Sequence, residues 1–255
     1  GAIKLIINIF VIFFNRITKI NNMMKKFLIT TLALCCAACN SDWRKQYDEV
    51  LPTRTENMMV RKGDKYGLVN PKGLEITPVK YDYIDTNPPQ DMPFYDVTIN
   101  NLRGIIKPSG EEIIPAEYDF IWYSQGVFVV KLNDSYQLLD SHNKSLTPWF
   151  DEIDVFYQGL AFAKNRGYYG FLNPKGELVL PFVYDDADHF NESGYAMVKY
   201  KGKWGMIDKK GNTKLPFEYE HAEPYSEPTE EWEDYYYMLI KNGKELTIDK
   251  EGNFL

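Results

Sequence analysis

The chain has 255 residues, of which 15% are aromatic and 25% charged, and its formal net charge is −7. Residues 1–39 contain five basic residues and no acid, which leaves 24 of the 29 basic residues against all 36 acidic ones, a net charge of −12 beyond residue 39. Recognition of nucleic acid needs a basic face, so this charge excludes nucleic acid as an expected partner. The high aromatic content favours strands over helices.

An export signal is predicted over residues 23–39. Two Met and two Lys residues precede the apolar stretch 27–34, and Cys36-Ala37-Ala38-Cys39 follows it. A charged start, a short apolar region and small residues before a cleavage point are the parts of a secretory signal. The last four residues resemble the lipobox of bacterial lipoproteins, with Cys where Leu is usual, and this resemblance implies that Cys39 carries a lipid. Ordinary cleavage after Ala38 is the alternative.

Residues 1–22 precede this signal. Their apolar run, residues 5–14, is shorter than the about 20 residues that span a bilayer. Because the chain starts at Gly1 rather than Met, we expect Met23 or Met24 to be the true start and residues 1–22 to lie upstream of it. An unusually long signal sequence is the alternative.

The stretch from residue 40 to residue 56 is polar, and we expect a tether there that can include a short helix. The three cysteines, Cys35, Cys36 and Cys39, all lie before it in the export segment. The mature domain is therefore expected to contain no disulfide, zinc cluster or thiol nucleophile.

Three sequence marks recur from residue 57 to residue 255. The first is an aromatic-Gly pair, found at Tyr66-Gly67, Tyr169-Gly170 and Trp204-Gly205 and weakened to Arg103-Gly104 and Tyr136-Gln137. The second is a turn residue, at Gly73, Gly110, Asn143, Gly176, Gly211 and Gly252. The third is a proline followed by an aromatic-acid pair; these prolines are Pro78, Pro115, Pro148, Pro181 and Pro216, spaced 37, 33, 33 and 35 residues apart. A fixed period of this size predicts a repeat architecture, here of about five and a half copies.

Each copy is predicted to be a three-stranded β-meander. Asn70-Pro71-Lys72-Gly73 has the residue preferences of a type I turn, and Asn143 replaces Gly where a left-handed backbone is expected. Proline cannot donate to a ladder and so ends the third strand, while the Gly of the aromatic-Gly pair leaves room for a neighbouring aromatic or backbone. One meander cannot bury its apolar face alone, so neighbouring copies are expected to stack.

The decapeptide Gly202-Lys203-Trp204-Gly205-Met206-Ile207-Asp208-Lys209-Lys210-Gly211 resembles the WG-repeat family, and the other copies are more degenerate. The resemblance implies a bacterial repeat protein built of β-strands, with no catalytic residues to transfer. We therefore predict an all-β fold in which tandem meanders form an open curved array. Closure into a five-bladed propeller is the alternative.

No enzymatic activity, metal or cofactor is predicted. The three histidines, His142, His189 and His221, occupy different places in the repeat. The acids Asp185, Asp186 and Asp188 lack the glycine and the distal glutamate of a calcium loop. The chain contains neither a Gly-x-Ser-x-Gly nucleophile motif nor a phosphate-binding glycine loop.

The best candidates for a binding surface are the aromatic residues Trp122, Tyr123 and Trp232, because loop aromatics stack on sugars or anchor peptides. Tyr235-Tyr236-Tyr237 is interpreted as the first strand of the sixth copy. We expect an exported, lipid-anchored module of the cell envelope that contacts a protein or peptide or has a structural role. A carbohydrate-binding module that uses the loop aromatics is the alternative, and an envelope hydrolase is a second one.

Overall fold

The computed structural model describes residues 42–87, 92–226 and 235–255. The chain divides into two units, Gly1–Tyr47 and Asp48–Leu255. The described part of the first unit contains one 3-10 turn, η1 (Trp43–Gln46). The predicted export segment with Cys39 and the candidate binding residue Trp232 lie outside the described residues. Among the described residues, no helix has the length and apolar character needed to cross a membrane.

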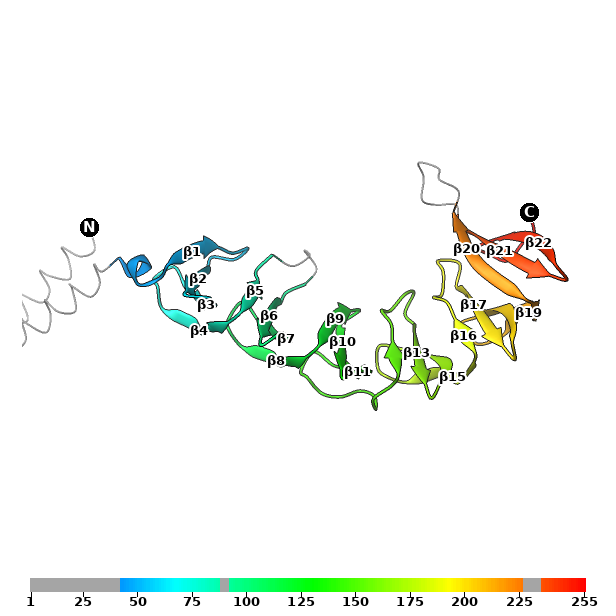
Figure 1. Cartoon of the computed structure of the whole chain (residues 1–255), viewed down its shortest axis with the longest axis horizontal. Coiled ribbons are helices and arrows are strands. Elements are labelled where there is room, and N and C mark those ends of the chain that lie inside the picture. Colours follow the sequence, from blue (N-terminus) through cyan, green and yellow to red (C-terminus); the bar gives the residue numbers. More distant parts are fainter. Residues whose placement is uncertain (1–41, 88–91, 227–234) are drawn as a thin grey trace, which may run out of the picture. The chain divides into compact units, whose positions relative to one another are not determined.

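The second unit consists of six small antiparallel sheets that follow one another along the chain (Figure 1). The first sheet contains β1 (Glu49–Pro52), β2 (Met58–Lys62), β3 (Lys65–Val69) and β4 (Glu75–Tyr81). The second sheet contains β5 (Tyr83–Asp85), β6 (Tyr95–Ile99), β7 (Leu102–Ile106) and β8 (Glu112–Tyr118). The third sheet contains β9 (Phe120–Ser124), β10 (Val127–Leu132) and β11 (Ser135–Leu139). The fourth sheet contains β12 (Glu152–Ile153), β13 (Ala161–Asn165), β14 (Tyr168–Leu172) and β15 (Leu178–Tyr184). The fifth sheet contains β16 (Asp186–Ala187), β17 (Tyr195–Tyr200), β18 (Lys203–Asp208) and β19 (Thr213–Tyr219). The sixth sheet contains β20 (His221–Ser226), β21 (Tyr235–Lys241) and β22 (Lys244–Asp249).

These sheets confirm the predicted all-β tandem repeat. The described residues form no α-helix, and no described strand of one sheet pairs with a strand of another, so the sheets form an open series rather than a closed barrel. The stretch Tyr235–Lys241 is the strand β21, as interpreted from the sequence.

Each sheet contains one strand that the sequence did not predict. The expected three-stranded meander is complete in the first, second, fourth and fifth sheets, and a short strand precedes it, for example β5 before β6 or β12 before β13. The expectation that the proline ends the third strand was wrong: Pro78 lies inside β4, which continues to Tyr81 and tolerates a proline because it is an edge strand. The short strand follows directly after the aromatic-acid pair and joins the sheet of the next copy. With only two residues in β12 and three in β5, such strands are too short for a period-two pattern to be read.

The same arrangement extends the first sheet into the predicted tether. Within residues 40–56, Glu49–Pro52 forms β1 and pairs with β2, with Val50 opposite Val60. Tyr47-Asp48 precedes β1 and is a further aromatic-acid pair, 34 residues before Tyr81-Asp82. Part of the expected tether is therefore the short first strand of a repeat.

The turn residues adopt the predicted conformation. The backbone N–H of Gly73 donates to the carbonyl of Asn70 at 2.9 Å, and Gly73 has a φ of 78°. Asn143, which replaces Gly in the third sheet, has a φ of 62°. The side-chain oxygen of Asn70 also accepts hydrogen bonds from the N–H groups of Lys72 and Leu74 at 2.9 and 3.0 Å. This Asx-type contact explains why Asn or Asp starts the turn in most copies.

The glycine of the aromatic-Gly pair lies directly under the third strand. A Cβ added to Gly170 would be 2.7 Å from the carbonyl oxygen of Leu180. In the third sheet Gln137 takes this place, and its amide donates to the carbonyl of Thr147 at 2.9 Å. There the third strand is reduced to the isolated bridges Tyr136↔Phe150 and Leu139↔Ser145. A regular third strand is therefore found in the sheets that have glycine at this position.

Neighbouring sheets bury one another's apolar side chains, as expected for stacked repeats. Phe171 of β14 and Phe190, which precedes β17, are 0% and 1% exposed, and their ring centroids are 4.8 Å apart. The cluster around them also contains Leu180 of β15 and Val198 of β17. Full burial of each such side chain contributes about 1.5–3 kcal/mol relative to exposure. The stability of one repeat therefore depends on the next.

Candidate ligand-binding pocket

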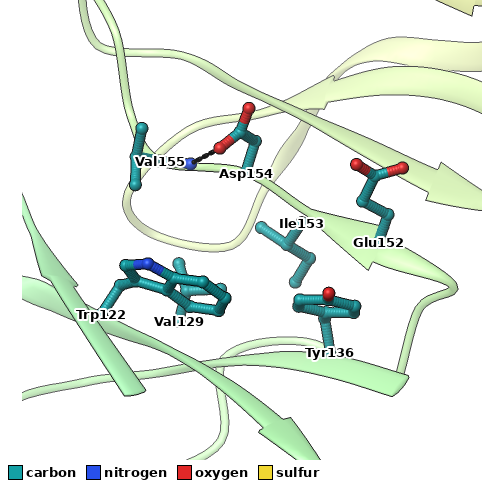
Figure 2. A pocket seen from close by; sticks show the side chains of 7 residues that line it. All are labelled: Trp122, Val129, Tyr136, Glu152, Ile153, Asp154 and Val155. Carbon is teal, nitrogen blue, oxygen red and sulfur yellow. Dashed lines mark hydrogen bonds between the residues drawn. The ribbon is translucent and has the colours of Figure 1, made fainter. Parts of the chain in front are cut away.

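A pocket of about 180 Å³ lies where the third sheet meets the fourth (Figure 2). Trp122, Val129 and Tyr136 line it from the third sheet, and residues 152–155 line it from the fourth. Pockets for drug-sized ligands usually measure about 300–1,000 Å³. This one therefore has room for a single side chain or a similarly small group.

The predicted site residues Trp122 and Tyr123 lie on opposite faces of β9. Successive residues of a strand alternate between its faces, so the two rings contact different partners. Trp122 packs against the apolar cluster shared with the fourth sheet. Tyr123 packs against the cluster shared with the second sheet, where its ring centroid lies 5.4 Å from that of Phe94 and 5.1 Å from that of Phe128. The structure therefore brings Trp122 to the pocket and leaves Tyr123 out of it.

Trp122 and Tyr136 form an aromatic wall. Their rings are nearly parallel, with an interplanar angle of 19° and centroids 6.2 Å apart, and Figure 2 shows them below the segment of residues 152–155. Phe120 extends this wall, with its ring centroid 4.1 Å from that of Trp122. Both Trp122 and Tyr136 are partly exposed. Tyr136 was not predicted as a site residue because it belongs to the aromatic-Gly mark, which the sequence presents as a structural feature.

Glu152 and Asp154 place two carboxylates on the opposite wall. Glu152 accepts a hydrogen bond from the hydroxyl of Tyr169 at 3.4 Å. Asp154 accepts a hydrogen bond from the backbone N–H of Val155 at 2.7 Å, drawn in Figure 2, and its other oxygen lies 3.2 Å from Nε2 of His189. Both carboxylates are only partly buried, so they can also face a ligand. The pocket thus combines aromatic faces with negative charge.

The corresponding place between the fourth and fifth sheets is filled differently. Counting from Asp151 and Asp185, the acids of the two aromatic-acid pairs, His189 corresponds to Val155. The ring centroid of His189 lies 5.0 Å from that of Tyr157 and 5.1 Å from that of Phe162. The smaller Val155 cannot reach across in this way. Its size is one reason why a cavity remains beside Trp122.

The three acids and the two other histidines that the sequence offered as polar site candidates each have a different environment, so they do not form one site. Asp185 accepts from the backbone N–H of Gly202, Asp186 from that of Ala187, and Asp188 from the hydroxyl of Tyr237. Of the remaining histidines, His142 lies in a hairpin turn and His221 pairs with Glu223 at 3.1 Å. Within the described part of the chain, no group of three or more His, Cys, Asp and Glu side chains is placed to hold a metal ion.

A comparison with protein families found matches within part of the repeat region. The family model described as "WG containing repeat" matches residues 104–136, 143–169, 169–204 and 204–229. A comparison with curated proteins found no match.

Among solved structures, Kluyveromyces lactis Hsv2p is 10% identical, with a TM-score of 0.39, and the alignment covers 80% of this chain and 75% of that one. PorZ, a bacterial surface component of the type-IX secretion system of Porphyromonas gingivalis, is 9% identical with a TM-score of 0.34, over 80% of this chain and 33% of that one. The extracellular domain of BT4673 from B. thetaiotaomicron is 10% identical with a TM-score of 0.35, over 82% of this chain and 36% of that one. The chain thus spans only about a third of the length of the two bacterial structures. Between residues 104 and 229, the protein carries four matches to the WG containing repeat.

Proposed function

We propose that this chain is an exported, lipid-anchored protein of the bacterial cell envelope whose β-repeats bind a protein or peptide, without catalysis. The observation that carries the proposal is the pocket beside Trp122, where partly exposed aromatic rings lie next to carboxylates. Aromatic side chains seated in a pocket are the usual energetic centres of protein interfaces. The export signal predicted from the sequence, with its lipobox-like end at Cys39, supports the location in the envelope.

A capture experiment tests the binding role. Full-length protein is immobilised and exposed to envelope extract, and the proteins retained by the wild type are compared with those retained by Trp122→Ala. We expect at least one retained protein whose affinity for Trp122→Ala is about thirtyfold lower, the effect of losing an interface residue worth about 2 kcal/mol. Trp149→Ala is the matched control, because Trp149 is 43% exposed and does not line the pocket. Equal capture by all three proteins would refute the role of the pocket.

The lipid anchor is tested separately. Cys39→Ala should move the protein from the membrane fraction to the soluble fraction of lysed cells, because a lipid on Cys39 is the proposed attachment. A protein that stays in the membrane fraction after this substitution is anchored by other means.

Carbohydrate binding is the second candidate. It is favoured by one observation, the nearly parallel rings of Trp122 and Tyr136, since aromatic faces also stack on sugar rings. Binding to a glycan array that Trp122→Ala abolishes, together with protein capture that it leaves unchanged, would support carbohydrate binding over protein binding.

A further inference from the structure

We propose that the pocket between the third and fourth sheets receives a basic side chain, arginine or lysine, of the bound protein. This inference rests on the proposed function, since it names the chemistry by which that site recognises its partner. Three features of the described residues support it: the aromatic wall, the carboxylates opposite it, and the size of the cavity.

The aromatic wall suits a cation. Positive groups are attracted to the faces of aromatic rings, most strongly to that of tryptophan. The repeat uses this contact internally at the aromatic-Gly position: Lys131 lies 5.6 Å from the ring centroid of Tyr136, and Lys164 lies 4.7 Å from that of Tyr169. Among the described cations, none lies over the ring of Trp122. A ligand cation can therefore make with Trp122 the kind of contact that Lys131 already makes with Tyr136.

The charges around the pocket favour the same ligand. Glu152 and Asp154 lie on the wall opposite the rings. Lys164 lies opposite Glu152 in the pairing of β12 with β13 and contacts the hydroxyl of Tyr169 at 3.3 Å, while Lys131 pairs with Asp134 at 2.9 Å. His189 is the remaining group that faces Asp154. A cation in the pocket would lie between two carboxylates and the ring of Trp122, where partial exclusion of water strengthens the attraction.

The remaining features fit a side chain on a basic protein. A volume of about 180 Å³ accommodates one long side chain and excludes a folded peptide segment. Beyond residue 39 the chain has a net charge of −12, which would steer a basic partner toward it and speed association. The predicted attraction is therefore both local and long-range.

The test uses small probes on the full-length protein. N-acetyl-arginine methylamide is titrated while the indole N–H signal of Trp122, assigned with Trp122→Phe, is followed by NMR. N-acetyl-citrulline methylamide has nearly the same shape without the charge. We expect the arginine probe to bind roughly fivefold to thirtyfold more tightly, as expected for a cation–aromatic contact of about 1–2 kcal/mol, with the preference falling as salt is added. Equal binding of the two probes would overturn the inference.

The carboxylates are tested by isosteric substitution. Glu152→Gln and Asp154→Asn should each reduce the preference for arginine over citrulline, whereas Glu177→Gln, at an exposed position outside the pocket, should leave it unchanged. The dispersion of each variant's amide spectrum checks that it is folded. A preference that survives both pocket substitutions would contradict the role of the carboxylates. A stronger response of Trp122 to methyl glucoside than to arginine would replace the inference with carbohydrate binding.

The outcomes separate this inference from the proposed function. If envelope proteins are captured through Trp122 but the arginine probe does not bind, the binding function stands and the basic side chain is wrong. If the arginine probe binds at Trp122 but capture does not depend on Trp122, the pocket chemistry stands and the protein-binding function is wrong.

Discussion

The carboxylate of Asp185 accepts a hydrogen bond from the backbone N–H of Gly202, with an oxygen–nitrogen distance of 2.7 Å. Asp185 is the acid of an aromatic-acid pair, and Gly202 lies in the hairpin turn between β17 and β18 of the sheet that follows. The backbone N–H of Asp185 donates to the carbonyl of Lys199 at 2.7 Å. The same side-chain contact recurs as Asp48 with Gly63, Asp82 with Asn100, Asp119 with Asn133, and Asp151 with Gly167. The acid of the mark therefore fastens the hairpin between the second and third strands in five of the six sheets.

Replacement of Asp185 by alanine should lower the free energy of unfolding by about 1 kcal/mol. A hydrogen bond to a charged group contributes about 1.5–3 kcal/mol, but this turn is exposed and water can replace part of the contact. The midpoint of urea unfolding measures the loss. Glu192→Ala, at an exposed acid outside the hairpin, should change stability by less than about 0.5 kcal/mol. Equal losses for the two variants would show that the contact contributes nothing specific.

Replacement of Gly170 by alanine should destabilise the protein by about 2–3 kcal/mol. The new Cβ would lie 2.7 Å from the carbonyl oxygen of Leu180, and β14 and β15 would have to separate. The matched control is Gln137→Ala, at the equivalent position of the third sheet, which already accommodates a Cβ and should lose only about 1 kcal/mol with its hydrogen bond. Thermal unfolding of both variants makes the comparison. A larger loss for Gln137→Ala would contradict the proposed role of the glycine.

Asp140 should contribute a stability that disappears in acid. The backbone N–H groups of Lys144 and His142 donate to its carboxylate at 2.9 and 2.8 Å and hold the pKa of Asp140 below its usual value. A lowered carboxyl pKa stabilises the folded state above the unfolded pKa, about 3.9, and this contribution is lost as the pH falls through the folded pKa. The difference in unfolding free energy between wild type and Asp140→Asn should therefore shrink between pH 6 and pH 3.

The Asp140→Asn variant should still form its turn at both pH values, because Asn70 and Asn173 accept the corresponding hydrogen bonds in their own copies. A difference that stays constant with pH, or grows in acid, would contradict this explanation.

Replacement of Val155 by histidine should close the pocket without unfolding the protein. Histidine stands at the corresponding place in the next copy, where His189 packs beside Phe162. We expect binding of the arginine probe to fall at least about tenfold, the equivalent of about 1.4 kcal/mol, while the unfolding midpoint stays close to that of the wild type. The control is Val155→Ala, which enlarges the pocket and should preserve binding. Unchanged binding by Val155→His would show that the probe binds elsewhere.

Much of this fold could be predicted because each mark in the sequence corresponds to a local physical need. Gly170 lies where the third strand passes close to the backbone, and Asn143 occupies a position with positive φ. The short strands β5 and β12 could not be predicted, since two or three residues show no periodicity. Tyr47-Asp48 offered a signal for β1, but its copy lacks the preceding proline that helped to define the mark.

The candidate site was only partly predictable. Trp122 stood out because it follows the aromatic-acid pair outside the repeat marks. Its neighbour Tyr123 was grouped with it although adjacent residues of a strand lie on opposite faces. Tyr136, Glu152 and Asp154 could not be identified from the sequence, because the cavity forms only where two sheets meet.

The most direct test of the account follows the five tryptophans of the full-length protein while a captured partner binds. Labelling with 5-fluorotryptophan gives each one a fluorine NMR signal, and Trp122→Phe and Trp149→Phe assign two of them. We expect the partner to shift the signal of Trp122 and to leave that of Trp149 in place. A partner that shifts Trp149 and leaves Trp122 unchanged would contradict the claim that the pocket between the third and fourth sheets is the binding site.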